Sequence, residues 1–106
     1  MEFFLDTADI AEVEALMPTG LIDGITTNPT LIAKSGRKWK DVVKEMCALV
    51  DGPISVEVAA LDYETMIKEG RALAAMSEKI AVKVPLTPAG LRVCKELSDD
   101  DHMVNV

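Results

Sequence analysis

Short apolar runs alternate along the chain with amphipathic stretches, and a turn separates each run from the stretch after it. The apolar runs are Phe3–Leu5, Gly24–Thr27, Ile54–Val58 and Ile80–Val84, and a fifth begins at Met103–Val106. Successive runs start about 20–30 residues apart, which is the length of one strand–helix unit. Strands that alternate with helices in this way predict an α/β fold with a parallel sheet.

The stretches between the runs carry helix start signals. Asp9, with Glu12 three residues later, is typical of a capping box, in which both side chains bond to free backbone N–H groups. Thr87 places a capping hydroxyl before Pro88, and proline suits the first helical position. We expect a further helix over residues 62–76. Apolar residues at helical spacing mark the buried faces: Ile10, Val13 and Leu16; Trp39, Val42, Val43, Met46 and Val50; Leu91, Cys94 and Leu97.

The last segment bears on domain organisation. The acidic run Asp99–Asp101 suits a turn, and the strand that starts at Met103 stops after four residues. A natural domain rarely ends part way through a core strand, and a chain of this size would struggle to cover both faces of a parallel sheet. We therefore expect a fragment that holds four strand–helix units and the start of a fifth.

Composition and charge exclude several classes of protein. Of the 106 residues, 49% are hydrophobic and 27% are charged, which excludes a disordered chain. The net charge is −7, and the densest basic run, Lys34–Lys44, is interrupted by Asp41, so we expect no nucleic-acid partner. No uncharged apolar run approaches the roughly 18 residues of a membrane span, so we expect no membrane partner.

The N-terminus and the cysteines indicate the compartment. The chain turns acidic at Glu2, which is unlike a secretory signal peptide. Two cysteines, Cys47 and Cys94, are too few for a disulfide framework or a metal site. We expect buried free thiols in a reducing cytosol, and therefore a cytoplasmic protein.

Polar side chains at the ends of the apolar runs are the candidate chemistry. Lys83 is flanked by valines in a core strand, where a lysine side chain needs a partner or a substrate. Desolvation inside a barrel would lower the pKa of such an amine and make it a nucleophile toward a carbonyl group. Asp6 and Glu57 end or lie near the ends of other strands, and carboxylates there suit the proton transfers that a Schiff base requires.

Each of these residues also has a purely structural interpretation. Lys83 is equally compatible with an ion-paired or snorkelling lysine, and Glu57 with its buried partner. Asp6 is also compatible with a cap on the first helix or on the loop after it. Asn28 precedes Pro29 in an ordinary turn signal, which makes Asn28 alone a weak site candidate.

Four segments together resemble the small transaldolase family, which includes fructose-6-phosphate aldolase-like proteins. The resemblance covers essentially the whole chain, and the second and fourth segments are specific in this order and spacing. The segments are Phe3-Phe-Leu-Asp-Thr-Ala-Asp9, Asp23-Gly-Ile-Thr-Thr-Asn-Pro-Thr-Leu-Ile32, Asp51-Gly-Pro-Ile-Ser-Val-Glu57, and Val82-Lys-Val-Pro-Leu-Thr87 with Gly90-Leu91.

The resemblance implies a (β/α)₈ TIM barrel, of which residues 1–106 would be the N-terminal half of a single domain. It implies Lys83 as the Schiff-base lysine and Asp6 as the group that takes the proton from the C4 hydroxyl of the substrate. It further implies that Glu57 works through a water in imine formation and that Thr26 and Asn28 hold substrate hydroxyls. No metal or other cofactor is expected, because the protonated imine is the electron sink.

The implied reaction moves a dihydroxyacetone unit from a ketose phosphate to an aldose phosphate, as in the pentose phosphate pathway. Fructose-6-phosphate aldolases of the family carry glutamine at the position of Glu57, so the carboxylate favours a transaldolase over this alternative. The serine and arginine that bind the substrate phosphate in the family lie outside this sequence, so we expect the chain to be inactive alone. A rival expectation from another class is a non-catalytic half-barrel module that self-associates as a homo-oligomer.

Overall fold

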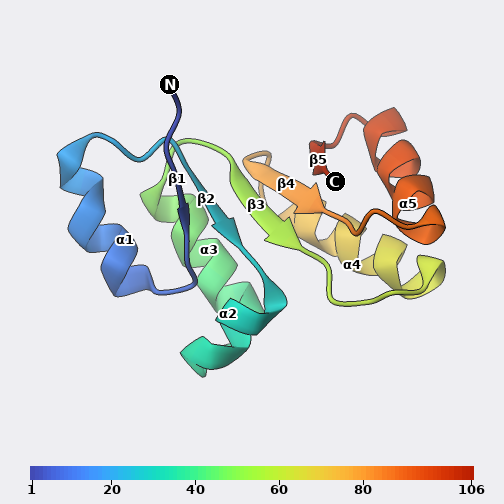
Figure 1. The fold of residues 1–106 in the computed structure, drawn as a ribbon, viewed down its shortest axis with the longest axis horizontal. Coiled ribbons are helices and arrows are strands. Elements are labelled where there is room, and N and C mark those ends of the chain that lie inside the picture. The colour runs from blue at the N-terminus through green and yellow to red at the C-terminus, as the bar shows by residue number, and fades with distance from the viewer.

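The computed structural model describes all residues 1–106 and contains one parallel sheet with its strands in chain order, β1-β2-β3-β4-β5 (Figure 1). Every pair of neighbouring strands is parallel. This confirms the predicted α/β fold and is consistent with part of a TIM barrel. The strands are β1 Phe4–Asp6, β2 Gly24–Thr27, β3 Ile54–Glu57, β4 Ile80–Lys83 and β5 Val104–Asn105.

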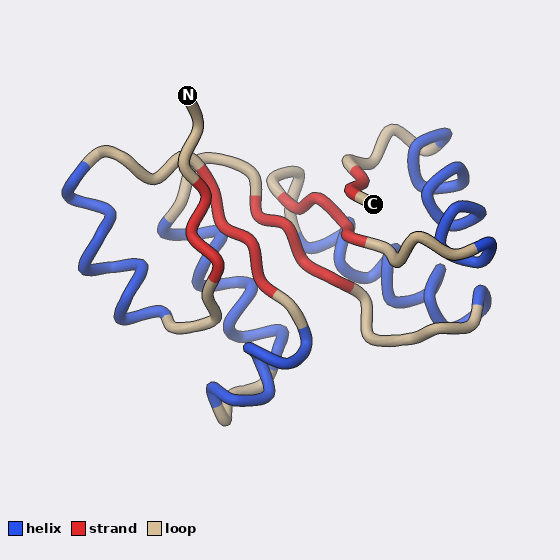
Figure 2. Tube along the Cα trace, viewed as in Figure 1, coloured by secondary structure: helices blue, strands red, loops and turns tan.

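Helices connect the strands, and α3 and α4 lie behind the sheet in the view of Figures 1 and 2. Apolar side chains of the sheet pack against them: Ile54 and Val56 of β3 and Val82 of β4 join one core cluster with Met46 of α3 and Met66 of α4. The helices are α1 Ile10–Leu16, α2 Pro29–Ser35, α3 Trp39–Leu49, α4 Tyr63–Met76 and α5 Pro88–Asp99, and a 3₁₀ turn, Met17–Thr19, follows α1. No helix has the length and apolar character needed to cross a membrane.

The helix start signals are confirmed in large part, with one correction. The side chain of Asp9 accepts hydrogen bonds from the N–H groups of Ala11 and Glu12, so Asp9 caps α1. The reciprocal half of the capping box is absent, because the N–H of Asp9 donates to the hydroxyl of Thr7 instead of to Glu12. Thr87 caps α5 through the N–H of Gly90 as expected.

The sequence patterns did not predict α2. Asn28 and Pro29 look like a turn signal, but Asn28 is the N-cap of α2 and Pro29 is its first residue. The same residue types start turns and helices, since an Asn side chain satisfies a free N–H group in both and proline has the φ angle that both need.

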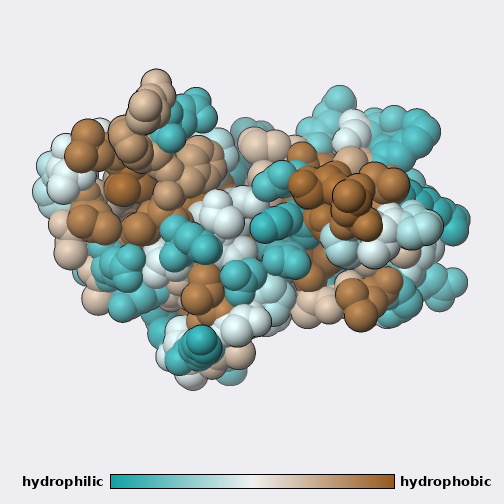
Figure 3. Space-filling view, viewed as in Figure 1, coloured by the Kyte–Doolittle hydropathy of each residue, from teal (hydrophilic) through white to brown (hydrophobic).

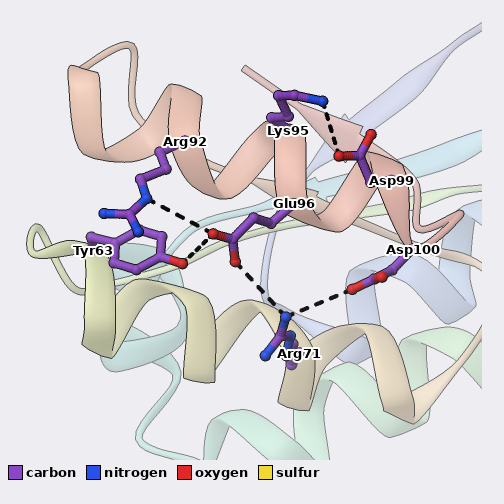
Figure 4. Close-up of polar contacts among 7 residues, drawn as sticks. All are labelled: Tyr63, Arg71, Arg92, Lys95, Glu96, Asp99 and Asp100. Atoms are coloured by element: carbon purple, nitrogen blue, oxygen red, sulfur yellow. Dashed lines mark hydrogen bonds and ion pairs between the residues drawn. The ribbon is translucent and has the colours of Figure 1, made fainter.

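Polar contacts between α4 and α5 hold these two helices together (Figure 4). The phenol of Tyr63 on α4 donates a hydrogen bond to the carboxylate of Glu96 on α5. Arg71 of α4 pairs with the same carboxylate at 3.8 Å and with Asp100 at 3.7 Å. The guanidinium of Arg92 lies 3.7 Å from the centroid of the Tyr63 ring. These contacts link α5 to α4 at the surface, and α5 begins five residues after the end of β4.

The second face of the sheet, called the open face here, is not covered by helices and is turned toward the viewer in Figures 1 and 3. Phe4 lies on this face over Gly24, where an added Cβ would meet its ring at 2.7 Å. Polar surface runs through the middle of the face, and apolar surface gathers near the N-terminus and around β5 (Figure 3). The open face is therefore the part of the fold on which polar side chains are available for chemistry.

Candidate active site

The register of the sheet puts the candidate residues on one face. Asp6 pairs with Thr26, and Thr26 pairs with Ser55. Two residues further along the strands, Glu57 pairs with Lys83. Side chains of register partners lie on the same face of a parallel sheet, and so do residues two apart in one strand. The open face thus carries two rows of side chains. The lower row, nearer the start of the strands, contains Asp6, Thr26 and Ser55. The upper row, at the carboxyl ends of the strands, contains Glu57 and Lys83.

Glu57 and Lys83 are the two candidates that the structure brings side by side. They end β3 and β4, both are half-buried, and neighbouring strands lie about 4.8 Å apart. The structure has no ion pair between them, so the interpretation of Glu57 as the ion-pair partner of Lys83 is wrong. Both charged groups lie at the carboxyl edge of a parallel sheet, which is where α/β proteins bind their ligands.

Asp6 lies further from Lys83 than Glu57 does. It is exposed at the end of β1, three strand spacings or about 14 Å from β4 along the sheet. Its side chain caps no helix, since Asp9 has that role, so the interpretation of Asp6 as a cap on the first helix is wrong.

Asn28 and Glu57 line a hollow of about 460 Å³ where β2, β3 and β4 end. The side-chain oxygen of Asn28 accepts a hydrogen bond of 3.0 Å from the N–H of Leu31, so this atom is used to cap α2. The amide nitrogen of Asn28 makes no hydrogen bond within the protein and is the part of the side chain that can bind a ligand. Pro85, two residues after Lys83, lines the same hollow, whereas Lys83, Asp6 and Thr26 do not.

Two further polar residues of the open face were not among the predicted site residues. Asn105 of β5 is the register partner of Lys83 and extends the upper row. Its amide nitrogen donates a hydrogen bond of 3.3 Å to the hydroxyl of Ser55 in the lower row. Alternation within the strands could have indicated both, because Ser55 lies two residues before Glu57 and Asn105 is the polar residue between two valines.

Other reactive groups do not form a second centre. No three His, Cys, Asp or Glu side chains are placed to hold a metal ion. Cys47 and Cys94 are free and half-buried, and burial raises the pKa of the Cys47 thiol, which disfavours the reactive thiolate. The amine of Lys79 bonds to the carbonyl oxygens of Cys47 and Val50, at 2.8 and 3.1 Å, and so caps the end of α3.

Comparison with known proteins gives one consistent family. The family model described as Transaldolase/Fructose-6-phosphate aldolase matches residues 3–106. The chain is 59% identical over 106 residues to a protein named "Probable transaldolase" from Rhodospirillum centenum, with 100% of this chain and 46% of the relative covered. It is 61% identical over 106 residues to a "Probable transaldolase" from Parvibaculum lavamentivorans, with 100% and 49% covered. The chain therefore spans about half the length of these relatives.

Proposed function

Since this chain belongs to the transaldolase/fructose-6-phosphate aldolase family, we propose that it carries the Schiff-base centre of a transaldolase, with Lys83 as the nucleophile. The observation that carries the proposal is the upper row of the open face, in which Lys83 lies between Glu57 and Asn105 at the carboxyl edge of the sheet. An amine beside a carboxylate that does not pair with it has a proton-transfer partner at hand.

Imine formation is the first step. The neutral amine of Lys83 attacks the C2 carbonyl of a ketose phosphate such as fructose 6-phosphate, and a C–N bond forms as the carbonyl oxygen takes a proton. Glu57, acting through a water, then delivers a proton to the carbinolamine hydroxyl, which leaves as water. The product is a protonated imine on Lys83, and this cation is the electron sink for the next step.

Carbon–carbon cleavage follows. Asp6 takes the proton of the C4 hydroxyl, the C3–C4 bond breaks, and its electron pair moves into the protonated imine to give an enamine. An aldose phosphate leaves, and the three-carbon enamine later attacks the aldehyde of a second aldose phosphate. Thr26 and Asn28 bind substrate hydroxyls during both steps. We assign complete transfer to a protein of the relatives' length, and imine formation to these 106 residues.

Borohydride trapping tests the proposal. The chain is incubated with fructose 6-phosphate and reduced, and its intact mass is measured, with Lys83→Ala as the control. We expect a stable adduct on the wild-type chain and none on the variant. The matched variant Lys79→Ala removes a lysine with a capping role and should still form the adduct. A wild-type chain without an adduct, or an adduct on Lys83→Ala, contradicts the proposal.

The carboxylate at position 57 favours a transaldolase over the alternative activity, fructose-6-phosphate aldolase. The two reactions differ in the fate of the enamine. A transaldolase keeps the three-carbon unit on Lys83 until an aldose phosphate accepts it, whereas an aldolase releases free dihydroxyacetone. Assay of free dihydroxyacetone without an acceptor separates them, and its release at the rate of cleavage would favour the aldolase.

A second candidate function, self-association, is favoured by the uncovered surface. The outer edges of β1 and β5 have no partner strand, and Phe4 and Met103 are 44% and 45% exposed. Edge strands and large exposed apolar side chains promote pairing with another chain. We expect light scattering to give at least twice the mass of the monomer at high protein concentration, and a folded monomer there would contradict this proposal.

A further inference from the structure

Glu69 of α4 holds the loop that follows Glu57. One oxygen of its carboxylate, Oε2, accepts hydrogen bonds from the N–H groups of Ala59 and Ala60, at 2.9 and 3.2 Å. These two residues belong to the β3–α4 loop, residues 58–62, which connects the end of β3 to the start of α4. Hydrogen bonds to a carboxylate are stronger than those between neutral groups. Glu69 is therefore an anchor for this loop.

The other contacts of the loop lie at its two ends. At its start, the N–H of Val58 donates to the carbonyl oxygen of Lys83 at 3.0 Å. At its end, Asp62 is the N-cap of α4. Between these points the one large side chain, Leu61, is 77% exposed, so apolar packing does not fix the middle of the loop. The position of the middle therefore depends on Glu69.

The loop is also part of a wall between two cavities. On one side is the hollow of about 460 Å³ that Asn28 and Glu57 line. On the other side is a cavity of about 420 Å³, called the rear cavity here, which Glu69 lines. Glu57, Val58 and Ala59 line both of them, whereas Glu69 does not line the hollow. Glu69 thus holds the loop from behind, and a loop without this anchor has room to move into the rear cavity.

No cation competes with the loop for the Glu69 carboxylate. Arg37 and Lys38 line the same rear cavity, but neither forms an ion pair with Glu69. The guanidinium of Arg37 is bound to the carboxylate of Glu45 instead, at 2.6 Å. The bonds of Glu69 to the backbone of the loop are therefore its only polar contacts in the protein.

We propose that Glu69 is a positioning residue for substrate binding: it holds the β3–α4 loop as a fixed wall of the hollow beside Glu57. This inference rests on the proposed function, because it takes the hollow as a place where the ketose phosphate binds. A wall that is already ordered spares the ligand the cost of ordering it. Glu57 is held by β3 and by its pairing with Lys83, so loss of the anchor should weaken binding and leave the chemical step unchanged.

The dependence of borohydride trapping on substrate concentration tests this role in the full 106-residue chain. Glu69→Met keeps the length and helix propensity of the side chain but removes the acceptor oxygen. We expect it to raise the half-saturating concentration of fructose 6-phosphate about tenfold, the effect of losing one oriented hydrogen bond, with the rate at saturation unchanged. Glu69→Gln keeps an oxygen that can accept both bonds and should remain close to wild type. Glu64→Met, at an exposed position of the same helix, is the matched control and should change neither quantity.

Hydrogen exchange, followed by NMR, reports on the contact without any substrate. The N–H groups of Ala59 and Ala60 should exchange faster in Glu69→Met than in wild type and remain slow in Glu69→Gln. The N–H of Val58, which bonds to β4, is the internal reference and should exchange at the same rate in all variants. Faster exchange at Val58 in Glu69→Met would show a general loss of stability and overturn the positioning role.

The remaining outcomes distinguish this inference from the proposed function. If wild type forms the adduct and Glu69→Met has the same half-saturating concentration, or lowers only the rate at saturation, the positioning role is overturned and the proposed function stands. Exchange at Ala59 and Ala60 that is equal in wild type and Glu69→Met also overturns the positioning role. A wild-type chain that forms no adduct at any concentration overturns the proposed function, and the role of Glu69 in substrate binding with it.

Discussion

Glu57 and Lys83 are register partners at the ends of β3 and β4, and they lie side by side on the open face without forming an ion pair. A carboxylate in a tight ion pair is a poor proton carrier, because the pair favours its charged form. The structure leaves Glu57 free of that constraint and next to the amine. This arrangement suits a pair with separate tasks, one group as nucleophile and the other as proton donor.

Replacement of Glu57 by Gln tests this division. Glutamine keeps the shape and hydrogen-bonding capacity of the side chain but cannot transfer a proton. General acid–base catalysis typically contributes at least a hundredfold, so we expect Glu57→Gln to slow adduct formation about 100-fold. The measurement is the time course of borohydride trapping with fructose 6-phosphate. Glu64→Gln, an exposed change on α4, serves as the control, and equal rates for the two variants would remove Glu57 from imine formation.

Asp6→Asn should slow carbon–carbon cleavage and leave imine formation unchanged. Asp6 lies three strands from Lys83 and is assigned to the C4 hydroxyl, so imine formation should proceed at about the wild-type rate. Cleavage should slow by about 100-fold or more, the range expected for loss of a general base. In a protein of the relatives' length, the mass of the trapped adduct separates the steps: Asp6→Asn should hold the whole six-carbon sugar phosphate, and wild type should accumulate the three-carbon unit. Failure of Asp6→Asn to form any adduct would reverse the roles of Asp6 and Glu57.

The strands were predictable because their signal is local. Each apolar run is bounded by turn residues, and β2 begins and ends where the pattern indicates, while the other strands differ by one residue at one or both ends. The end of β4 has a physical reason, since Pro85 cannot donate a backbone hydrogen bond. The helix α2 was missed because Asn28 and Pro29 start turns and helices by the same chemistry.

The sequence indicates which residues are candidates for the site, but it does not indicate how these residues are arranged. Lys83 and Glu57 stand out in the sequence because charged residues are rare inside core strands. Their position on the same face follows from the register of β3 and β4, and this register cannot be read from the sequence. The bond between Ser55 and Asn105 joins residues 50 positions apart and depends on the small side chain of Ala81 between them. Such a contact is visible only once the strands are placed side by side.

The contact between Tyr63 and Glu96 should make stability depend on pH in the alkaline range. The hydrogen bond to the Glu96 carboxylate raises the pKa of the Tyr63 phenol above its ordinary value of 10.0. Its contribution to folding is therefore complete below about pH 10 and is lost as the pH rises through the higher pKa of the folded state. The free energy of unfolding of wild type should exceed that of Tyr63→Phe at pH 7 to 9, and this difference should shrink above pH 10.

Urea unfolding of both proteins at matched pH values measures this difference. Lysine residues also titrate in this range, but both proteins contain the same ones, so their effect cancels in the comparison. A difference between wild type and Tyr63→Phe that stays constant to pH 11 would show that the phenol does not donate to Glu96.

Gly90→Ala should damage the connection between β4 and α5. A Cβ at Gly90 would lie 1.9 Å from the carbonyl oxygen of Pro85 and 3.2 Å from the hydroxyl of Thr87, so the backbone after Lys83 would have to move. We expect a loss of more than about 3 kcal/mol in the free energy of unfolding, as for other changes that force backbone out of place. Gly36→Ala is the matched control: Gly36 has a φ of +72° and no atom within 4 Å of an added Cβ, so only the backbone penalty of about 1 kcal/mol applies. Urea unfolding of the two variants compares these costs directly, and a smaller loss for Gly90→Ala than for Gly36→Ala would mean that the carbonyl group of Pro85 does not lie against Gly90.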